Sequence, residues 1–220
     1  MSPAKLTRTL YLRASIILAV ALALTPLSAR AQDATSAQGF VQSNVENALQ
    51  ILQSESLAPQ QKREQLHTLL LSVLDAQRIA MYTLGQAQTT ANPTDLAAFT
   101  DAFREFLIAN FGYGLNTYSG RAFNVIGSTQ RAPNDFVVST LVVDRSGSAN
   151  GKAPSEVDFR ILYEGGKYAI VDASVRGVWL AVAQHDDFQS FLADHNGDLA
   201  ALTAHLKQMT DMIAQRIAAY

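Results

Sequence analysis

The sequence predicts an α+β domain built on a four-stranded antiparallel sheet that is packed with helices from both ends of the chain. Apolar residues recur at three- and four-residue steps from Phe40 to Leu107, as on one face of a helix. Strand-like segments rich in β-branched and aromatic residues then run from Phe123 to Val175, and helical spacing returns at Val178. No repeat, low-complexity tract or long linker divides the chain, so we expect a single domain over residues 32–220.

The start of the chain has the layout of a secretory signal peptide. Residues 1–13 are basic, residues 14–24 form an uncharged apolar run, and Ala29 and Ala31 place small side chains where a signal peptidase reads. The apolar run is too short to span a bilayer, and an uncleaved membrane anchor is the alternative. No cysteine stands near the cleavage site, which excludes a lipoprotein anchor. We therefore predict a signal peptide over residues 1–31 and a periplasmic domain after it.

Composition excludes several function classes. The signal segment holds four of the 17 basic residues and none of the 19 acidic ones, so the remainder has a formal net charge of −6. An acidic surface disfavours nucleic acid and anionic membrane as steady partners. The chain has no cysteine, so it has no disulfide, no thiol chemistry and no thiolate metal site.

Local signals place the helices before the sheet. Gln32 to Ala37 is polar and small and is interpreted as a mobile lead-in to the first helix. Proline favours the first turn of a helix, and Asp or Asn favours its cap. These signals predict a first helix over residues 40–52, a second from Pro59, a third between Asp75 and Gly85, and a long fourth from Asn92-Pro93.

Four strands follow, separated by turn signals rich in Pro, Asn and Gly. They are expected over residues 123–130, 136–144, 156–164 and 167–175. The third strand alternates, with Val157, Phe159, Ile161 and Tyr163 on one face and charged residues on the other. This pattern is typical of an antiparallel sheet with one buried and one solvated face.

Few residues suggest catalysis. The chain after the signal segment lacks a phosphate loop, a His-Glu-x-x-His pair and a Gly-x-Ser-x-Gly elbow. Its histidines are spaced too widely for a metal site on one helical face, so no metal or other cofactor is expected. Asp172 stands out because apolar residues surround it within a strand, where a carboxylate must find donors or shift its pKa. It is either a paired structural residue or a catalytic one.

Large apolar residues lie on elements that should face each other. Phe99, Phe103 and Phe106 line the long helix, and Val157, Phe159, Ile161 and Tyr163 line the sheet. Such faces fill a core, or they leave an apolar cavity between a curved sheet and the helices that cover it. Periodicity does not separate the two interpretations.

Residues 36–210, nearly the whole domain after the signal segment, resemble the toluene-tolerance, or MlaC-type, family. The resemblance is carried by Gly-Lys-Tyr-Ala-Ile-Val-Asp over residues 166–172, Val-Arg-Gly-Val-Trp-Leu over 175–180 and Phe-Gln-Ser-Phe-Leu over 188–192. The order of Asp75, the Leu84-Gly85 pair and the phenylalanines of the long helix agrees with it. The run after Val178 is closer to the hopanoid-associated branch, and Gln184-His185 stand where the family often has Tyr-Arg.

The resemblance implies a periplasmic, non-enzymatic carrier of phospholipid or a related lipid. Its implied partners are an inner-membrane ABC lipid transporter complex and an outer-membrane lipoprotein complex, and its implied role is to maintain outer-membrane lipid asymmetry. A hopanoid-linked carrier, an enzyme using Asp172 on a similar fold, and an adaptor with a filled core are the alternatives. The candidate lipid-binding residues are Phe99, Phe103, Phe106, Val157, Phe159, Ile161, Tyr163 and Trp179. Trp179 is expected to be largely buried, either at the lip of the lipid slot or behind it.

Overall fold

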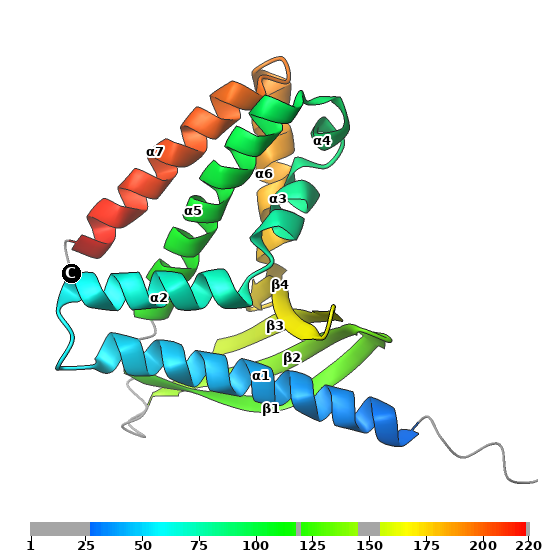
Figure 1. Cartoon of the computed structure of the whole chain (residues 1–220), viewed down its shortest axis with the longest axis vertical. Helices are drawn as coiled ribbons and strands as arrows, with labels where there is room; N and C mark the ends of the chain where they lie inside the picture. The colour runs from blue at the N-terminus through cyan, green and yellow to red at the C-terminus, as the bar shows by residue number, and fades with distance from the viewer. Residues whose placement is uncertain (1–26, 118–119, 145–154, 219–220) are drawn as a thin grey trace, which may run out of the picture.

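The computed structural model describes residues 27–117, 120–144 and 155–218 (Figure 1). The helices before the sheet are α1 (Leu27–Gln53), α2 (Pro59–Val73), α3 (Ala76–Leu84), α4 (Ala87–Thr90) and α5 (Pro93–Thr117). The strands are β1 (Arg121–Ala132), β2 (Asp135–Asp144), β3 (Ser155–Glu164), β4 (Lys167–Val175) and β5 (Val178–Trp179), and helices α6 (Leu180–Asp194) and α7 (Leu199–Ala218) follow. Most of the expected signal peptide, residues 1–26, lies outside the described residues.

The strands form one antiparallel sheet in chain order, β1 to β5. The prediction of four strands was wrong by one, and the helix that follows the sheet, α6, begins at Leu180 rather than at Val178. Arg176 and Gly177 both have positive φ, 53° and 80°, and reverse the chain tightly. Val178 and Trp179 therefore pair with Val175 and Ser174 before the helix starts. A strand of two residues is too short for a period-2 pattern, so the sequence shows no signal for it.

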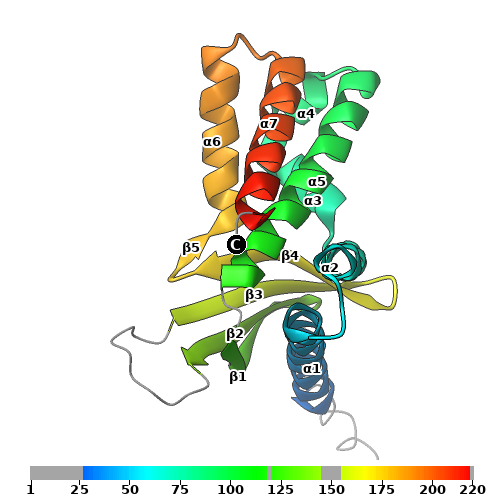
Figure 2. The same cartoon turned by 90° about the vertical axis from the view of Figure 1, so that its left-hand side faces the viewer.

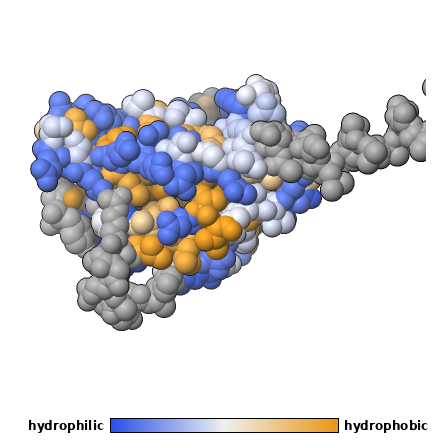
Figure 3. Space-filling model, turned by 90° about the horizontal axis from the view of Figure 1, so that it is seen from below, coloured by the Kyte–Doolittle hydropathy of each residue, from blue (hydrophilic) through white to orange (hydrophobic). Residues whose placement is uncertain are grey.

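Burial alternates along β3, whereas Ile170 to Ser174 of β4 are all buried, so only part of the sheet has a solvated face. Side chains of β2 and β3 alternate, and Val138 and Ile161 are fully buried on the inner face. Helix α1 lies along the sheet, while α3, α5, α6 and α7 rise from it as a group (Figures 1 and 2). Seen from below, the molecule presents hydrophobic and hydrophilic side chains next to one another (Figure 3).

Helix α1 begins earlier than the sequence suggested. The expected mobile lead-in, Gln32 to Ala37, is helical, and Ala37 has no exposed surface. Gln38 Nε2 donates to Ser128 Oγ over 2.8 Å, and the Ser128 hydroxyl donates to the Ala34 carbonyl over 3.3 Å. These hydrogen bonds join α1 to β1 residues that are ninety or more positions away along the chain. Tertiary packing therefore overrides the weak helix preference of the small, polar residues 32–37.

The other helix boundaries follow the predicted caps. Pro59 opens α2, and the Asp75 carboxylate accepts a 3.0 Å hydrogen bond from the Arg78 N–H at the start of α3. Asn92 Oδ1 accepts from the Asp95 N–H over 2.9 Å and caps α5. Gly85 ends α3, as predicted. The single turn of α4 was not predicted.

Side chains of α6 bind the open end of α3. Gln189 Nε2 donates to the Leu84 carbonyl over 3.0 Å, and the His185 Nδ1–H donates to the Tyr82 carbonyl over 3.1 Å. Both carbonyls lie in the last turn of α3, where a helix leaves carbonyls without intrahelical partners, and the Tyr82 carbonyl also accepts from the Gly85 N–H over 3.1 Å. Glycine permits this close approach because it has no Cβ: a Cβ at position 85 would lie 2.6 Å from His185 Cε1. Glycine also adopts the φ of +54° found at this position without strain. Helix α6 is therefore attached to α3 along one side.

We predict that Gly85→Ala destabilises the fold by about 1–3 kcal/mol, since it adds both backbone strain and a steric clash. Gly39→Ala in α1 is the control, because no atom lies within 4 Å of its added Cβ. The control should be neutral or stabilising by up to about 1 kcal/mol. Urea denaturation measures both, and equal unfolding midpoints for the two variants would contradict the clash.

Candidate functional site

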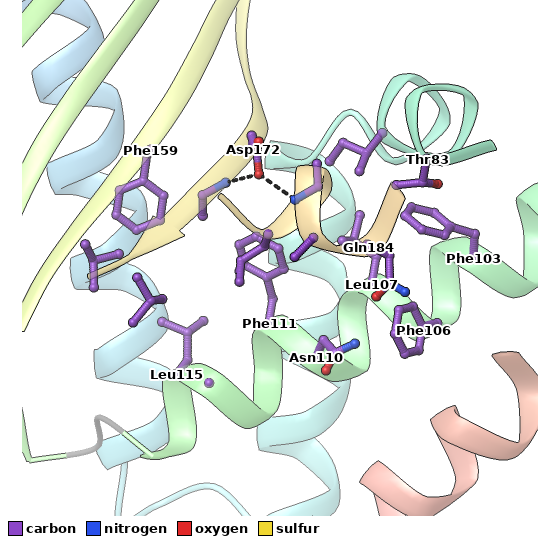
Figure 4. A pocket seen from close by; sticks show the side chains of 18 of the residues that line it. Thr83, Phe103, Phe106, Leu107, Asn110, Phe111, Leu115, Phe159, Asp172 and Gln184 are labelled. Atoms are coloured by element: carbon purple, nitrogen blue, oxygen red, sulfur yellow. Dashed lines mark hydrogen bonds between the residues drawn. The ribbon is translucent and has the colours of Figure 1, made fainter. Parts of the chain in front are cut away.

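A cavity of about 290 Å³ lies between α5, the start of α6, α3 and the inner face of β3 and β4 (Figure 4). Its walls are mainly apolar, with a few amide and carboxylate side chains among them. The lining residues are Ile79, Thr83, Phe103, Phe106, Leu107, Asn110, Phe111, Gly114, Leu115, Phe123, Val157, Phe159, Asp172, Ala173, Val175, Leu180, Ala181, Ala183, Gln184 and Asp187. We call this the sheet cavity.

Helical and strand periodicity produce the two apolar walls. On α5 the lining residues recur at steps of three and four, from Phe103 to Leu115. On the sheet, Val157 pairs with Val175 and Phe159 with Ala173, so their side chains share the inner face. Figure 4 shows Phe106, Phe111 and Leu115 on the α5 side and Phe159 across from them. The cavity is thus the space left where α5 diverges from the strands.

Four of the eight candidate residues line this cavity: Phe103, Phe106, Val157 and Phe159. Phe99 and Ile161 have no exposed surface and belong to the core. The ring of Phe99 lies 5.8 Å from that of Phe103 and meets the Phe188 ring edge-on at 5.9 Å. These two residues therefore pack the structure around the cavity.

The remaining two candidates, Tyr163 and Trp179, are not among the lining residues. Tyr163 is 36% exposed, and its ring lies 4.6 Å from that of Tyr168. Tyr168 in turn meets Phe40, so α1 covers this end of the sheet. Trp179 is half-buried at the N-cap of α6, next to the lining residue Leu180. Alternation identified the correct sheet face, but it did not show how much of that face α1 covers.

Several lining residues were not among the candidates. Phe111 and Leu115 continue the apolar stripe of α5 beyond Phe106, and this stripe is visible in the sequence. The α6 residues Ala181 and Gln184 gave no such signal, because they are small or polar. Their position depends on the tight turn before β5.

Asp172 positions the start of α6. One carboxylate oxygen, Oδ1, accepts hydrogen bonds from the Ala173 N–H over 2.8 Å and from the Ala181 N–H over 2.9 Å (Figure 4). The N-cap residue of α6, Trp179, has no side-chain cap, so Asp172 satisfies a helix N–H in its place. Burial raises the pKa of Asp172, although both N–H bonds and the charge of Arg160 oppose that shift.

A β-bulge brings Asp172 to this position. Arg160 pairs with Asp172 and Ile161 with Ile170, so Val171 is the extra residue. The irregularity turns the Asp172 carboxylate toward the helix that follows the sheet. Of the two interpretations of Asp172, the bonds favour the paired structural residue.

Besides the carboxylates of Asp172 and Asp187, the cavity lining contains neutral polar groups. The Thr83 hydroxyl donates to the Ala80 carbonyl over 2.9 Å, and the other neutral polar groups are the amides of Asn110 and Gln184. Within residues 27–117, 120–144 and 155–218, no three His, Asp or Glu side chains are grouped as a metal site would need. In the same ranges, no helix combines the length and apolarity that crossing a membrane requires.

The fold and the cavity define an α+β protein with an apolar chamber between its sheet and its helices. This chain belongs to the MlaC family, whose sequence model, described as MlaC protein, matches residues 42–208. The resemblance noted in the sequence is thereby confirmed. A solved structure of a phospholipid-binding protein from Ralstonia solanacearum, in complex with a phospholipid, has a similar fold. The TM-score is 0.67 at 18% identity, over 81% of this chain and 98% of the other.

We predict different effects on stability for two substitutions of Asp172. Asp172→Ala removes the acceptor for Ala181 and should cost about 1–2 kcal/mol of stability at neutral pH. Asp172→Asn keeps an oxygen that can accept the same bonds and removes a buried charge, so it should be close to neutral there.

The pH dependence has a definite sign. Because the pKa of Asp172 is raised in the folded state, the native protein binds the proton more tightly than the unfolded chain does. The stability of the wild type minus that of Asp172→Asn should therefore increase as the pH falls through the raised pKa of the folded state toward the ordinary pKa of an aspartate. Urea denaturation at several pH values measures this difference, and a difference that shrinks on acidification would contradict the assignment.

Proposed function

We propose that this protein is a periplasmic carrier that binds phospholipid in the sheet cavity and passes it between membrane-bound complexes. The observation that carries the proposal is the cavity itself, which is apolar on both walls and lies between the sheet and the helices. Membership of the MlaC family supports it. The Ralstonia solanacearum protein, which holds a phospholipid on a similar fold, supports the class of ligand.

The energetics suit a carrier. Shielding acyl chains from water is worth about 0.8 kcal/mol per methylene, so a cavity can compete with a bilayer for the tails of a lipid. A bilayer shields the same tails equally well, and transfer in either direction is then close to balance. The protein's task is kinetic: it lowers the barrier to extraction and keeps the tails out of water during transit.

The size of the cavity sets a condition for loading. If a chain carbon takes roughly the 30 Å³ of a water molecule, about 290 Å³ holds on the order of ten of them. Two full acyl chains need a larger volume than this, so we expect the sheet cavity to widen between α5 and α6 when lipid enters. Leu180, 42% exposed at the start of α6, is suited to contact tails during entry.

The remaining parts of the proposal follow from the family resemblance and from the sequence. A signal peptide over residues 1–31 would deliver the domain to the periplasm. There it would receive lipid from or give it to an inner-membrane ABC transporter complex and an outer-membrane lipoprotein complex, maintaining outer-membrane lipid asymmetry. Resemblance to the hopanoid-associated branch makes a related lipid the alternative cargo. We propose no catalytic role, since Asp172 already serves as a helix cap.

Filling the cavity tests the lipid site without removing any packing. Gly114 lines the cavity, and no atom lies within 4 Å of a Cβ added there. Gly114→Leu should therefore fold and reduce co-purified phospholipid severalfold, whereas Gly39→Leu, another helical glycine with open space around it, should leave it unchanged. Mass spectrometry of extracted lipid measures both. Full lipid content in folded Gly114→Leu protein would refute the assignment of phospholipid to this cavity.

The single tryptophan reports on the same site. Trp179 is adjacent to the lining residues Leu180 and Ala181, so acyl chains carrying bromine should quench its emission once they are exchanged into the protein. Brominated detergent below its micelle concentration is the control and should quench less. If brominated lipid binds and the emission does not change, Trp179 lies behind the slot and is not a lipid contact.

A further inference from the structure

A second cavity, of about 390 Å³, lies on the opposite side of α5 from the sheet cavity. It is enclosed by the end of α1, by α2, by α5 and by α7, and no strand contributes to it. Its lining residues are Leu52, Lys62, Arg63, Leu66, His67, Leu70, Glu105, Ile108, Ala109, Gly112, Asn116, Thr210, Ala214 and Ile217. We call it the helix cavity.

The two cavities share no lining residue, because α5 separates them. Leu107, Phe111 and Gly114 of α5 face the sheet cavity, whereas Ile108 and Gly112 face the helix cavity. Residues one apart on a helix point in different directions, so a side chain added on one face does not enter the other cavity. The helix cavity is therefore a candidate site in its own right.

Its interior is apolar and its charged groups are at the rim. Leu66, Leu70 and Ile108 are buried and form the floor. Such a floor suits an acyl chain, whose burial is worth about 0.8 kcal/mol per methylene. With roughly 30 Å³ per chain carbon, 390 Å³ holds on the order of a dozen carbons, which is one medium-length chain.

The rim selects the head group. The Lys62 ammonium donates to the Leu52 carbonyl over 3.0 Å, and the His67 Nε2–H donates to the Glu105 carboxylate over 3.2 Å. The only carboxylate among these lining residues is thus already engaged by His67, and the cations Lys62 and Arg63 line the same cavity. Arg63 is exposed and forms no ion pair with the residues that the structure describes. Its planar guanidinium is suited to bind a carboxylate through two parallel hydrogen bonds.

We propose that the helix cavity binds a free fatty acid, with the chain between α2, α5 and α7 and the carboxylate at Arg63 and Lys62. This site is distinct from the phospholipid site proposed above and does not depend on it. The sheet cavity contrasts with it, since carboxylates and no basic residue are among its lining residues. One chain would then hold two classes of lipid on opposite sides of one helix.

The experiment uses calorimetric titration of the mature protein with dodecanoate below its micelle concentration. Dodecyltrimethylammonium, which has a chain of the same length and the opposite charge, is the matched ligand. We expect one dodecanoate per protein and binding of the cation at least about tenfold weaker. Arg63→Glu should weaken dodecanoate binding by about tenfold and narrow or reverse this preference.

Three variants locate the site. Gly112→Leu fills the helix cavity, and the Cβ it adds makes only an ordinary 3.7 Å contact with Leu66. Ala214→Phe fills it from an exposed position on α7, which protects the test against a folding failure. Both should abolish dodecanoate binding and leave co-purified phospholipid unchanged. Gly114→Leu, which fills the sheet cavity, should leave dodecanoate binding unchanged.

Several results would overturn the proposal. Absence of dodecanoate binding, or equal binding of the cation, would exclude an anion-selective site. Loss of dodecanoate binding in Gly114→Leu with retention in Gly112→Leu and Ala214→Phe would place the fatty acid in the sheet cavity. Phospholipid content, measured in the same preparations, separates this failure from failure of the carrier proposal. A fatty acid site without bound phospholipid would contradict only the carrier.

Discussion

The attachment of α6 is the constraint on which the sheet cavity depends. Its start is held to β4 by the bond from the Ala181 N–H to Asp172. Further along, Phe188 packs edge-on against Phe99 and Phe103 of α5, with ring centroids about 6 Å apart. Between these two points the side of α6 that faces α5 lines the cavity. Because α6 is fixed at both points, it forms a supported wall of the cavity between them.

The side of α6 that packs against α3 explains why α6 does not move inward and close the sheet cavity. His185 and Gln189 donate hydrogen bonds to carbonyls at the open end of α3. Carbonyls at a helix terminus need partners, and the α6 side chains provide them only at this separation. The wall of the cavity is therefore held by directional polar contacts. Contacts between apolar side chains are not directional. Without the polar bonds to α3, we therefore expect hydrophobic burial to draw the walls of the sheet cavity together.

Helix α5 connects the two candidate binding functions. It packs against α7, borders the sheet cavity with one face and borders the helix cavity with another. A binding event that widens one cavity by moving α5 would change the volume of the other. Two ligands on opposite faces of one helix would then affect each other's affinity, and any such coupling would be reciprocal.

The sequence by itself determined the fold class, the four long strands, most helix boundaries and the family. These features depend on local chemistry: Asp75 and Asn92 cap the turns beside them, and alternation along β3 marks the buried face of the sheet. It also identified four residues of the sheet cavity, because Phe103 and Phe106 on α5 and Val157 and Phe159 on β3 follow simple periodicities. Such signals span a few residues and need no knowledge of the rest of the chain.

Only the tertiary structure decided where these faces enclose space. Ile161 and Tyr163 follow the same alternation as Phe159, yet one lies in the core and the other near the surface, because α1 and Tyr168 occupy that end of the sheet. The role of Asp172 depends on a bulge and on an N–H nine residues away. The helix cavity joins residues from Leu52 to Ile217, which no local pattern connects. A cavity forms where packed helices and strands leave space between them, and its position therefore depends on contacts between segments that are distant in the sequence.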